Sequence, residues 1–358
     1  MEKKISKKKN KKPPPENNNY LPKKVALIYS DVKREYFPTD DQYITEKDAF
    51  KEASVIAKYL NRLKIKTFLF PGTPTLPFKL RREKPDMVIN LVASVKGNEY
   101  LASTIPAMLE FLEIPYTGSG ILGESLSYNK FLVRKLMQQN GIPVPNCQLF
   151  YNHVDPLDYN LRFPLISKLN EIHGAVEITK DSISENEKHL RLRLKYLIET
   201  YNQPVMVEEF IVGQEITALL FEGFNKKVYL GEKIIKKNTG KYRFASFELQ
   251  WLDTDENIAY RKFEDLLLRE YVKKAFEVAE MFDYGKFDIR LDQSGRYFFV
   301  DANSNPAFGS KELECAIASI LDLYEVTFIE ILKRLIENTM RDAMGKKLLP
   351  ITKNGNNS

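Results

Sequence analysis

The sequence predicts an α/β domain with a parallel sheet, followed by α+β structure with antiparallel strands. Three observations support this fold class. Apolar runs alternate with helical patterns across residues 20–125, the pattern shifts toward strands from Cys147 onward, and residues 285–308 form a predicted hairpin with a turn at Ser294-Gly295. The chain has 358 residues, too many for one ordinary core, which indicates two or three domains.

The N-terminal part is expected to alternate strand and helix. Its first strand is the apolar run 25–29, and apolar residues at helical spacing predict a helix over 46–63. The next expected elements are strands at 66–70 and 87–91, a loop at 92–98 and a helix ending near residue 110. This order predicts a small parallel sheet.

The rest of the chain is expected to be richer in antiparallel strands. Residues 115–120, PYTGSG, break regular structure, and a helix over 127–139 ends before Gly141, since Pro143 and Pro145 forbid its continuation. The remaining expected elements are strands at 165–168, 205–207, 216–221, 228–230 and 233–235, and helices at 185–201, 263–281 and 313–339.

The predicted hairpin carries a group of oxygen ligands. Alternation puts Lys286, Asp288 and Arg290 on one face of its first strand. Asp301 and Asn303 share a face at the end of the second strand. Three oxygen ligands on neighbouring strands suit Mg²⁺, and the flanking cations suit phosphates. A polar hairpin end is the alternative, since Asp and Asn are common turn residues.

Bulk composition is that of a soluble globular protein, with 43% hydrophobic and 28% charged residues. No run of about 18 apolar residues predicts a membrane span, and the N-terminus lacks the apolar segment of a secretory signal. Cys147 and Cys315 lie far apart, so we expect no disulfide framework and a cytoplasmic location. The three histidines lack zinc-ligand spacing.

The net charge of +6 belongs mostly to the N-terminus. Residues 1–19 hold seven lysines and two glutamates, which leaves about +1 for the rest. A lysine run followed by proline and asparagine triplets predicts a disordered tail over 1–19. A solvated extension is favoured over contact with nucleic acid or acidic lipid, and no nucleic-acid partner is expected for the rest.

Four sequence segments, taken together and in their order along the chain, indicate a protein family. They are PAMLEFLEIPYTGSGILGESLSYNKFLVRKLMQQNGIPVP (106–145), FPLISKLNEIHGAVEI (163–178), VMVEEFIVGQEIT (205–217) and the hairpin. Together they resemble the D-alanine–D-alanine ligase branch of the ATP-grasp enzymes, over roughly residues 85–335. The resemblance implies an ATP-grasp fold of three domains, with ATP held between two α+β domains. The expected divisions are 20–125, 126–215 and 216–345, with a flexible tail at 346–358.

The resemblance implies an ATP site. The positions that correspond to ATP-contacting residues of the family are Lys130, Lys168, His173, Gly174, Glu208, Glu209, Phe210, Ile211 and Glu215. Lys130 and Lys168 would hold phosphates, residues 208–211 would contact adenine, and Glu215 would bond the ribose. From these residues alone, a solvated Lys130 and an exposed Glu215 would be the simpler interpretation.

The resemblance also implies a metal site and a group of catalytic residues. The metal positions, for one or two Mg²⁺ with Mn²⁺ as the alternative, correspond to Asp288, Asp301 and Asn303. Asp301 stands where glutamate is usual, and Lys286 stands where an arginine stabilises the tetrahedral intermediate. Arg290 is a candidate to share that role or is a surface residue of the strand. Glu46 corresponds to the glutamate that anchors the first substrate's amine.

Departures from the family pattern bear on the substrate. The phosphate loop at 173–176 lacks serine, so His173 either binds phosphate, acts near the amine or fills the loop. The acidic-loop signature is reduced to residues 95–99, and Gln250-Trp251 replaces a lysine-tyrosine pair. Residues 304–310 replace the glycine-centred turn that receives the second substrate's carboxylate.

The implied activity is an ADP-forming carboxylate–amine ligase that works through an acyl phosphate. D-alanine as both substrates, in peptidoglycan precursor synthesis, is the first expectation. The alternatives are the same chemistry on another amino acid or dipeptide, and a non-catalytic ATP-binding descendant. A homodimer is also expected from the resemblance.

Overall fold

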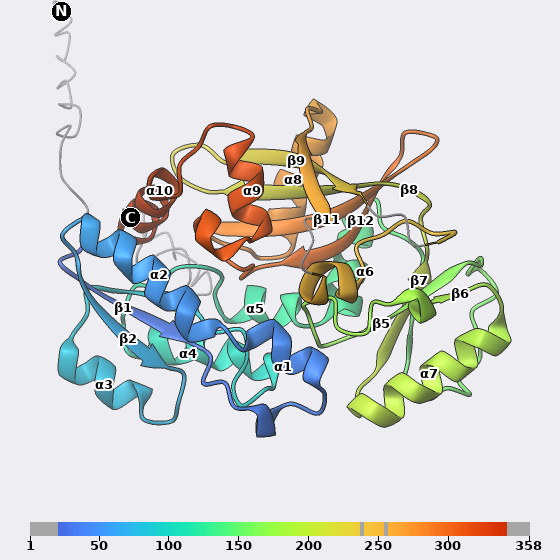
Figure 1. Cartoon of the computed structure of the whole chain (residues 1–358), viewed down its shortest axis with the longest axis horizontal. Coiled ribbons are helices and arrows are strands. Elements are labelled where there is room, and N and C mark those ends of the chain that lie inside the picture. The colour runs from blue at the N-terminus through green and yellow to red at the C-terminus, as the bar shows by residue number, and fades with distance from the viewer. Residues whose placement is uncertain (1–20, 237–239, 254–256, 342–358) are drawn as a thin grey trace, which may run out of the picture.

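The computed structural model describes residues 21–236, 240–253 and 257–341 (Figure 1). The tails expected at 1–19 and 346–358 lie outside these ranges. Three sheets organise the described chain, in the strand orders β2-β1-β3, β4-β7-β5-β6 and β10-β9-β8-β11-β12.

The first sheet is parallel, which confirms the predicted α/β domain. Its strands are β1 (Lys24–Tyr29), β2 (Lys66–Pro71) and β3 (Met87–Leu91), and its helices are α1 (Asp40–Glu46), α2 (Ala49–Arg62), α3 (Leu76–Glu83) and α4 (Thr104–Phe111). The helix predicted over 46–63 is wrong at its start, because Asp48 occupies the N-cap position of α2 and separates it from α1. Aspartate favours such a cap over a helix interior.

The second sheet is antiparallel and small. Its strands are β4 (Cys147–Phe150), β5 (Leu165–Leu169), β6 (Ile183–Ser184) and β7 (Val205–Glu209), and the helix α7 (Glu187–Tyr201) accompanies them. Leu190, Leu194 and Leu197 of α7 pack in one apolar cluster with Val205 and Val207 of β7. This lobe therefore has its own core.

The third sheet is antiparallel and contains the predicted hairpin. Its strands are β8 (Gly213–Phe221), β9 (Lys227–Ile235), β10 (Ile258–Lys262), β11 (Tyr284–Asp292) and β12 (Tyr297–Asn303). Alternate residues of β8 face opposite sides. Ile216 and Ala218 pack toward α6 (Lys130–Gln139) and α8 (Leu266–Val278), whereas Leu219 packs toward α9 (Ala316–Asp322) and α10 (Phe328–Arg341).

Two predicted helices are divided in the structure. The one expected at 127–139 is preceded by α5 (Ile121–Ser127), and Asn129 caps α6 by accepting from the N–H of Leu132 at 3.0 Å. The one expected at 313–339 is interrupted where Glu325 has a φ of +57°. Thr327 and Glu330 then bond each other's backbone N–H groups in a capping box. The strands expected at 228–230 and 233–235 form one strand, β9.

One apolar core joins the first and third sheets. Val25 and Leu27 of β1 lie in the same cluster as Leu219 of β8, Ile320 of α9 and Leu332 of α10. The second sheet has a separate cluster. We propose the division 20–125, 126–215 and 216–345 on the basis of the three sheets, although α6 packs on the third sheet through Val133 and Met137.

Candidate active site

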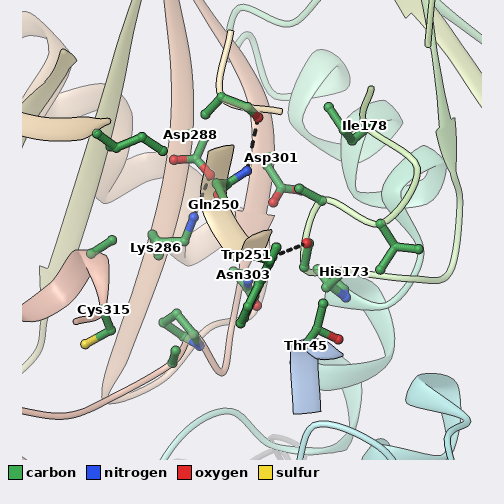
Figure 2. A pocket seen from close by; sticks show the side chains of 18 of the residues that line it. Thr45, His173, Ile178, Gln250, Trp251, Lys286, Asp288, Asp301, Asn303 and Cys315 are labelled. Atoms are coloured by element: carbon green, nitrogen blue, oxygen red, sulfur yellow. Dashed lines mark hydrogen bonds and ion pairs between the residues drawn. The ribbon is translucent and has the colours of Figure 1, made fainter. Parts of the chain in front are cut away.

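A cavity of about 1310 Å³ is lined by all three parts of the chain (Figure 2). Residues of β5 and β7 line one side, and residues of β8, β9, β11 and β12 line another. Further lining residues come from the segments 44–52, 172–178, 244–253 and 305–322, among others. Cavities that bind small molecules usually measure about 300–1,000 Å³, so this one has room for a nucleotide and further substrates.

A buried arginine and a partly buried lysine meet at the carboxylate of Glu208, whose side chain is 1% exposed. Lys168 Nζ lies 2.5 Å from Glu208 Oε1 and donates to the carbonyl oxygen of Val300 at 3.0 Å. Arg134 Nη2 lies 3.0 Å from Glu208 Oε2. This network joins β5, β7 and α6 at the edge of the cavity. The ammonium of Lys168 has three donors, so one is left for a phosphate.

Lys130 is the first residue of α6 and lines the cavity. Its Nζ donates to the carbonyl oxygen of Ile172, directly before the predicted phosphate loop at 173–176. Burial lowers the pKa of Lys130, and the nearby carboxylate of Asp301 opposes that shift. Lys130 and Lys168 therefore line the same cavity, and their phosphate contacts stay predictions, whereas Arg134 was not predicted.

The guanidinium of Arg290 contacts the predicted adenine hinge at 208–211. Its Nε donates to the carbonyl oxygen of Ile211 at 3.0 Å, and Nη1 and Nη2 donate to the carbonyl oxygen of Arg243 at 3.2 and 3.1 Å. The guanidinium also lies 5.0 Å from the ring centroid of Phe210, a cation–π distance. These contacts give Arg290 a positioning role that the sequence did not predict.

Glu215 binds two cations at the same end of the cavity. Its carboxylate lies 2.7 Å from Lys233 Nζ and 3.1 Å from Arg290 Nη1. Burial acts to raise the pKa of Glu215, but the two cations outweigh it and hold that pKa below its usual range. Glu215 is therefore an ionised acceptor beside the hinge. The roles of Lys233 and of the contact between Arg290 and Arg243 were not predicted, because the partners lie far apart in sequence.

The hinge residue Glu209 points away from these groups. Its Oε2 accepts from Asn146 Nδ2 at 3.2 Å, and its Oε1 accepts from the backbone N–H of Arg162 at 2.9 Å. The carboxylate of Glu209 is therefore bound by other residues, and its backbone N–H donates to the carbonyl oxygen of Asn146 at 3.1 Å. Phe210 and Ile211 line the cavity beside it.

The three predicted metal ligands lie together on the hairpin (Figure 2). Asp288 is directly opposite Asp301 in the strand register, and Asn303 is opposite Lys286. Asp288 accepts from Lys286 Nζ at 2.5 Å and from Thr217 Oγ1 at 2.8 Å. Burial opposes ionisation of Asp288, but Lys286 and Lys233 outweigh it and lower its pKa. Asp288 is thus held as a carboxylate.

The state of the Asp301 carboxylate shows whether these three residues suit a bound cation. Burial acts to raise its pKa, but Lys130, His173 and Lys286 together lower it. Among the described residues, the carboxylate of Asp301 makes no hydrogen bond or ion pair. Two ionised carboxylates and an amide oxygen suit Mg²⁺. In the described ranges no group of three or more His, Cys, Asp and Glu side chains fits a metal, so this set depends on Asn303.

The predicted phosphate loop is fixed from two sides. Glu99 Oε2 lies 2.8 Å from His173 Nδ1 and accepts from the His173 backbone N–H at 2.8 Å. Trp251 Nε1 donates to the carbonyl oxygen of Gly174 at 2.7 Å. A Cβ at Gly174, whose φ is +70°, would lie 2.7 Å from Thr45 Cγ2, so this glycine allows the close approach of α1.

Glu46 lies in the cavity wall at the end of α1. Its Oε2 accepts from Ser94 Oγ at 2.7 Å, and the hydroxyl of Ser30 also stabilises the ionised carboxylate. Burial and the neighbouring Glu99 raise the pKa of Glu46 to about 7. The hairpin, the phosphate loop and Glu46 therefore share one cavity, as the sequence predicted. Nε2 of Gln250, which stands where the family has a lysine, donates a hydrogen bond to the carbonyl oxygen of Ala245 at 3.0 Å.

The parallel sheet and the two antiparallel sheets around this cavity define an ATP-grasp protein. The chain matches the family described as "D-ala D-ala ligase C-terminus" over residues 136–337, more than half of its length, and it belongs to that family. It is 26% identical over 269 residues to a D-alanine--D-alanine ligase of Aquifex aeolicus, covering 72% of this chain and 85% of that one. It is also 29% identical over 231 residues to an uncharacterized protein, y4sG, of Sinorhizobium fredii, covering 63% and 66%.

A solved structure shares the fold. The D-alanine--D-alanine ligase of Bacillus anthracis complexed with ATP aligns with a TM-score of 0.67 at 18% identity, over 89% of this chain and 97% of that one. Among the described residues, no helix is long and apolar enough to cross a membrane.

Proposed function

We propose that this protein is an ADP-forming carboxylate–amine ligase that uses ATP. Membership of a ligase family supports the reaction class. The observation that carries the proposal is the ionised, unpaired carboxylate of Asp301, faced in one cavity by Lys130, Lys286 and His173. Cations and a carboxylate that can hold Mg²⁺ are what a transferred phosphate needs.

The nucleotide would lie between the second and third sheets. We propose that the backbone of residues 208–211 contacts adenine and that Glu215 bonds the ribose hydroxyls. Lys130, Lys168 and the backbone at His173 and Gly174 would hold the phosphates. The contacts of Arg290 to Ile211 and Glu215 then keep the hinge and the ribose acceptor in register.

In the first step, a carboxylate oxygen of one substrate attacks the terminal phosphorus of ATP. The bond from that phosphorus to the ADP oxygen breaks, and an acyl phosphate forms. Lys130 and Lys168 offset the negative charge of the transferred group, while closure of the cavity excludes water. Asp288, Asp301 and Asn303 would hold one or two Mg²⁺, or Mn²⁺, which would neutralise phosphate oxygens.

In the second step, the nitrogen of an amine attacks the acyl carbon. A C–N bond forms, and Lys286 offsets the charge on the oxygen of the tetrahedral intermediate. The C–O bond to phosphate then breaks, and the nitrogen's proton leaves with the phosphate. Lys286 supplies a point charge where an arginine would supply a fork, so its geometry is less constrained.

Family membership supports D-alanine as the first substrate to test, together with a role in peptidoglycan precursor synthesis in the cytoplasm. The test is ADP release by the purified protein with Mg²⁺ and ATP, against D- and L-amino acids singly and in pairs. Turnover that needs only D-alanine supports that substrate. Turnover with another pair keeps the reaction and replaces the substrates.

A non-catalytic ATP-binding protein is the second candidate, favoured by the lysine at 286 and the missing serine at 173–176. ATP binding without ADP release, across a panel that includes amines and dipeptides, would support it. A homodimer is a further proposal from the family, which sedimentation of the purified chain would test.

A further inference from the structure

Side chains on one face of the third sheet form rows that run across its strands. In the register of β8 with β9 and β11, Glu215 lies opposite both Lys233 and Arg290. Two residues further along β8, Thr217 lies opposite Asp288. Alternate residues share a face and each residue advances a strand by about 3.4 Å, so the two rows are about 7 Å apart. The first row lies at the predicted hinge, and the second contains a predicted metal ligand.

The ammonium of Lys233 lies between these two rows. Its Nζ is 2.7 Å from Glu215 Oε1 and 3.8 Å from Asp288 Oδ1. Among the described residues, only Glu215 accepts a hydrogen bond from this ammonium, which has three N–H donors. The side chain of Lys233 is 6% exposed and lines the cavity. It therefore presents a buried positive charge, with donors to spare, to a ligand in the cavity.

A nucleotide bound as proposed has to pass this ammonium. Its ribose would lie at Glu215, and its terminal phosphates would lie at Lys130, Lys168 and the hairpin carboxylates. The α-phosphate is attached to the ribose, so it would lie between these two ends. Lys130 and Lys168 belong to α6 and β5, whereas Lys233 belongs to β9. Lys233 therefore faces the expected α-phosphate from the third-sheet wall of the cavity.

The third sheet contributes two other cations to the described lining, and both have different partners. Arg290 donates to the carbonyl oxygen of Ile211 at the hinge. Lys286 lies 2.5 Å from Asp288 Oδ2 and belongs to the next row beyond Asp288, further from the ribose position. Of the three, Lys233 is the cation best placed for the α-phosphate.

We propose that Lys233 is a phosphate-binding residue whose ammonium donates to the α-phosphate of the bound adenine nucleotide. This inference rests on the proposed function, because it places the nucleotide as the ligase would hold it. Without Lys233, the α-phosphate would lie beside the carboxylates of Glu215 and Asp288 and be repelled by both. A lysine that only held Glu215 for the ribose would act on the nucleoside and on the nucleotide equally.

The test compares AMP with adenosine, which differ only in the α-phosphate. Both are titrated calorimetrically into the full chain with Mg²⁺, and adenosine is measured by competition with adenylyl imidodiphosphate where its own heat is too small. The native chain should bind AMP at least about tenfold more tightly than adenosine, as a hydrogen bond between charged groups predicts. Lys233→Met, which keeps the length of the side chain without its charge, should lower this preference by at least about tenfold.

The matched control is Lys226→Met. Lys226 directly precedes β9, lies 2.7 Å from Glu277 and is outside the cavity lining, so its loss should change neither affinity. Should Lys233→Met fail to fold, Lys233→Gln keeps a donor for Glu215 without the charge and should show the same loss of preference. An equal loss of AMP and adenosine affinity overturns the inference, and so does a native chain that binds both with equal affinity.

The same titrations separate this inference from the proposed function. Failure of AMP, adenosine and adenylyl imidodiphosphate to bind would overturn the nucleotide site and this inference with it. ADP release by the native chain, together with an unchanged preference for AMP in Lys233→Met, would keep the ligase and remove Lys233 from the phosphate contacts.

Discussion

Glu99 binds His173 twice with one oxygen, across 74 positions of the chain. Oε2 of Glu99 lies 2.8 Å from both the backbone nitrogen and Nδ1 of His173. The N-terminal part of the molecule therefore holds the phosphate loop in place through a side chain that is itself buried.

Removing that carboxylate should weaken nucleotide binding. Glu99→Ala leaves the His173 N–H without its acceptor and frees the imidazole, at a cost of about 1–3 kcal/mol for a buried donor. We expect the KM for ATP to rise by roughly tenfold, measured by ADP release. Glu113→Ala, on an exposed turn, should have no effect. An unchanged KM for ATP in Glu99→Ala would show that the loop is held by its other contacts.

Asp301 should be required for turnover. Asp301→Ala removes the unpaired carboxylate, and we expect ADP release to fall by at least about a hundredfold, since a lost ligand or its partner costs 10–100-fold or more at such sites. Asp301→Glu keeps the charge and should retain measurable turnover. ADP release at the normal rate in Asp301→Ala would remove Asp301 from the metal assignment.

A substitution of Arg290 tests whether this residue positions the hinge or acts on the tetrahedral intermediate. Arg290→Lys keeps the charge but loses the forked contacts to Ile211 and Arg243. If Arg290 positions the hinge, the KM for ATP should rise by about tenfold while kcat changes by less than about threefold. A fall in kcat at unchanged KM would instead assign Arg290 to the tetrahedral intermediate.

Glu46 should make stability fall as pH rises. Its pKa is raised from 4.5 to about 7 in the folded chain, so the folded state holds a proton that the unfolded state releases between these values. The resulting stabilisation is complete below about pH 4.5 and is lost as pH rises through about 7, by roughly 3 kcal/mol in total.

Glu46→Gln removes the titrating carboxyl group, so a comparison with this variant isolates the contribution of Glu46 to the pH dependence of stability. The free energy of unfolding of the native chain, minus that of Glu46→Gln, should decrease by roughly 3 kcal/mol between about pH 4.5 and pH 8. Urea unfolding at several pH values measures the difference. A difference that does not vary with pH would mean that Glu46 titrates normally.

The sequence predicted β1, β2, β3, β5, β7, β8, β9 and the hairpin because their signals are local, but it did not predict β4, β6 or β10. The run 25–29 and the alternation from Phe287 to Leu291 are each readable within a few residues. The division between α9 and α10 was missed because no glycine or proline marks it. Instead, Glu325 adopts a left-handed backbone conformation, φ +57°, in a stretch whose apolar spacing continues.

The site could be predicted only as far as the family motifs reach. The sequence identified Lys168 and Glu208 separately, but their contact at 2.5 Å depends on the pairing of β5 with β7. Alternation placed Arg290 on the ligand-bearing face, yet its partners at Ile211 and Arg243 belong to other segments. The contact of Trp251 with Gly174 likewise joins residues 77 positions apart.

The apolar core shared by β1, β8 and α10 has a mechanical consequence. Separating the first sheet from the third would expose Val25, Leu219 and Leu332 to water at a cost of about 1.5–3 kcal/mol for each side chain. The lobe of β4 to β7 has its own core, so a shift of this lobe would leave that core buried. We therefore expect any opening of the cavity for substrate entry to occur by displacement of this lobe, which contains Lys168 and the hinge, against the joined first and third sheets.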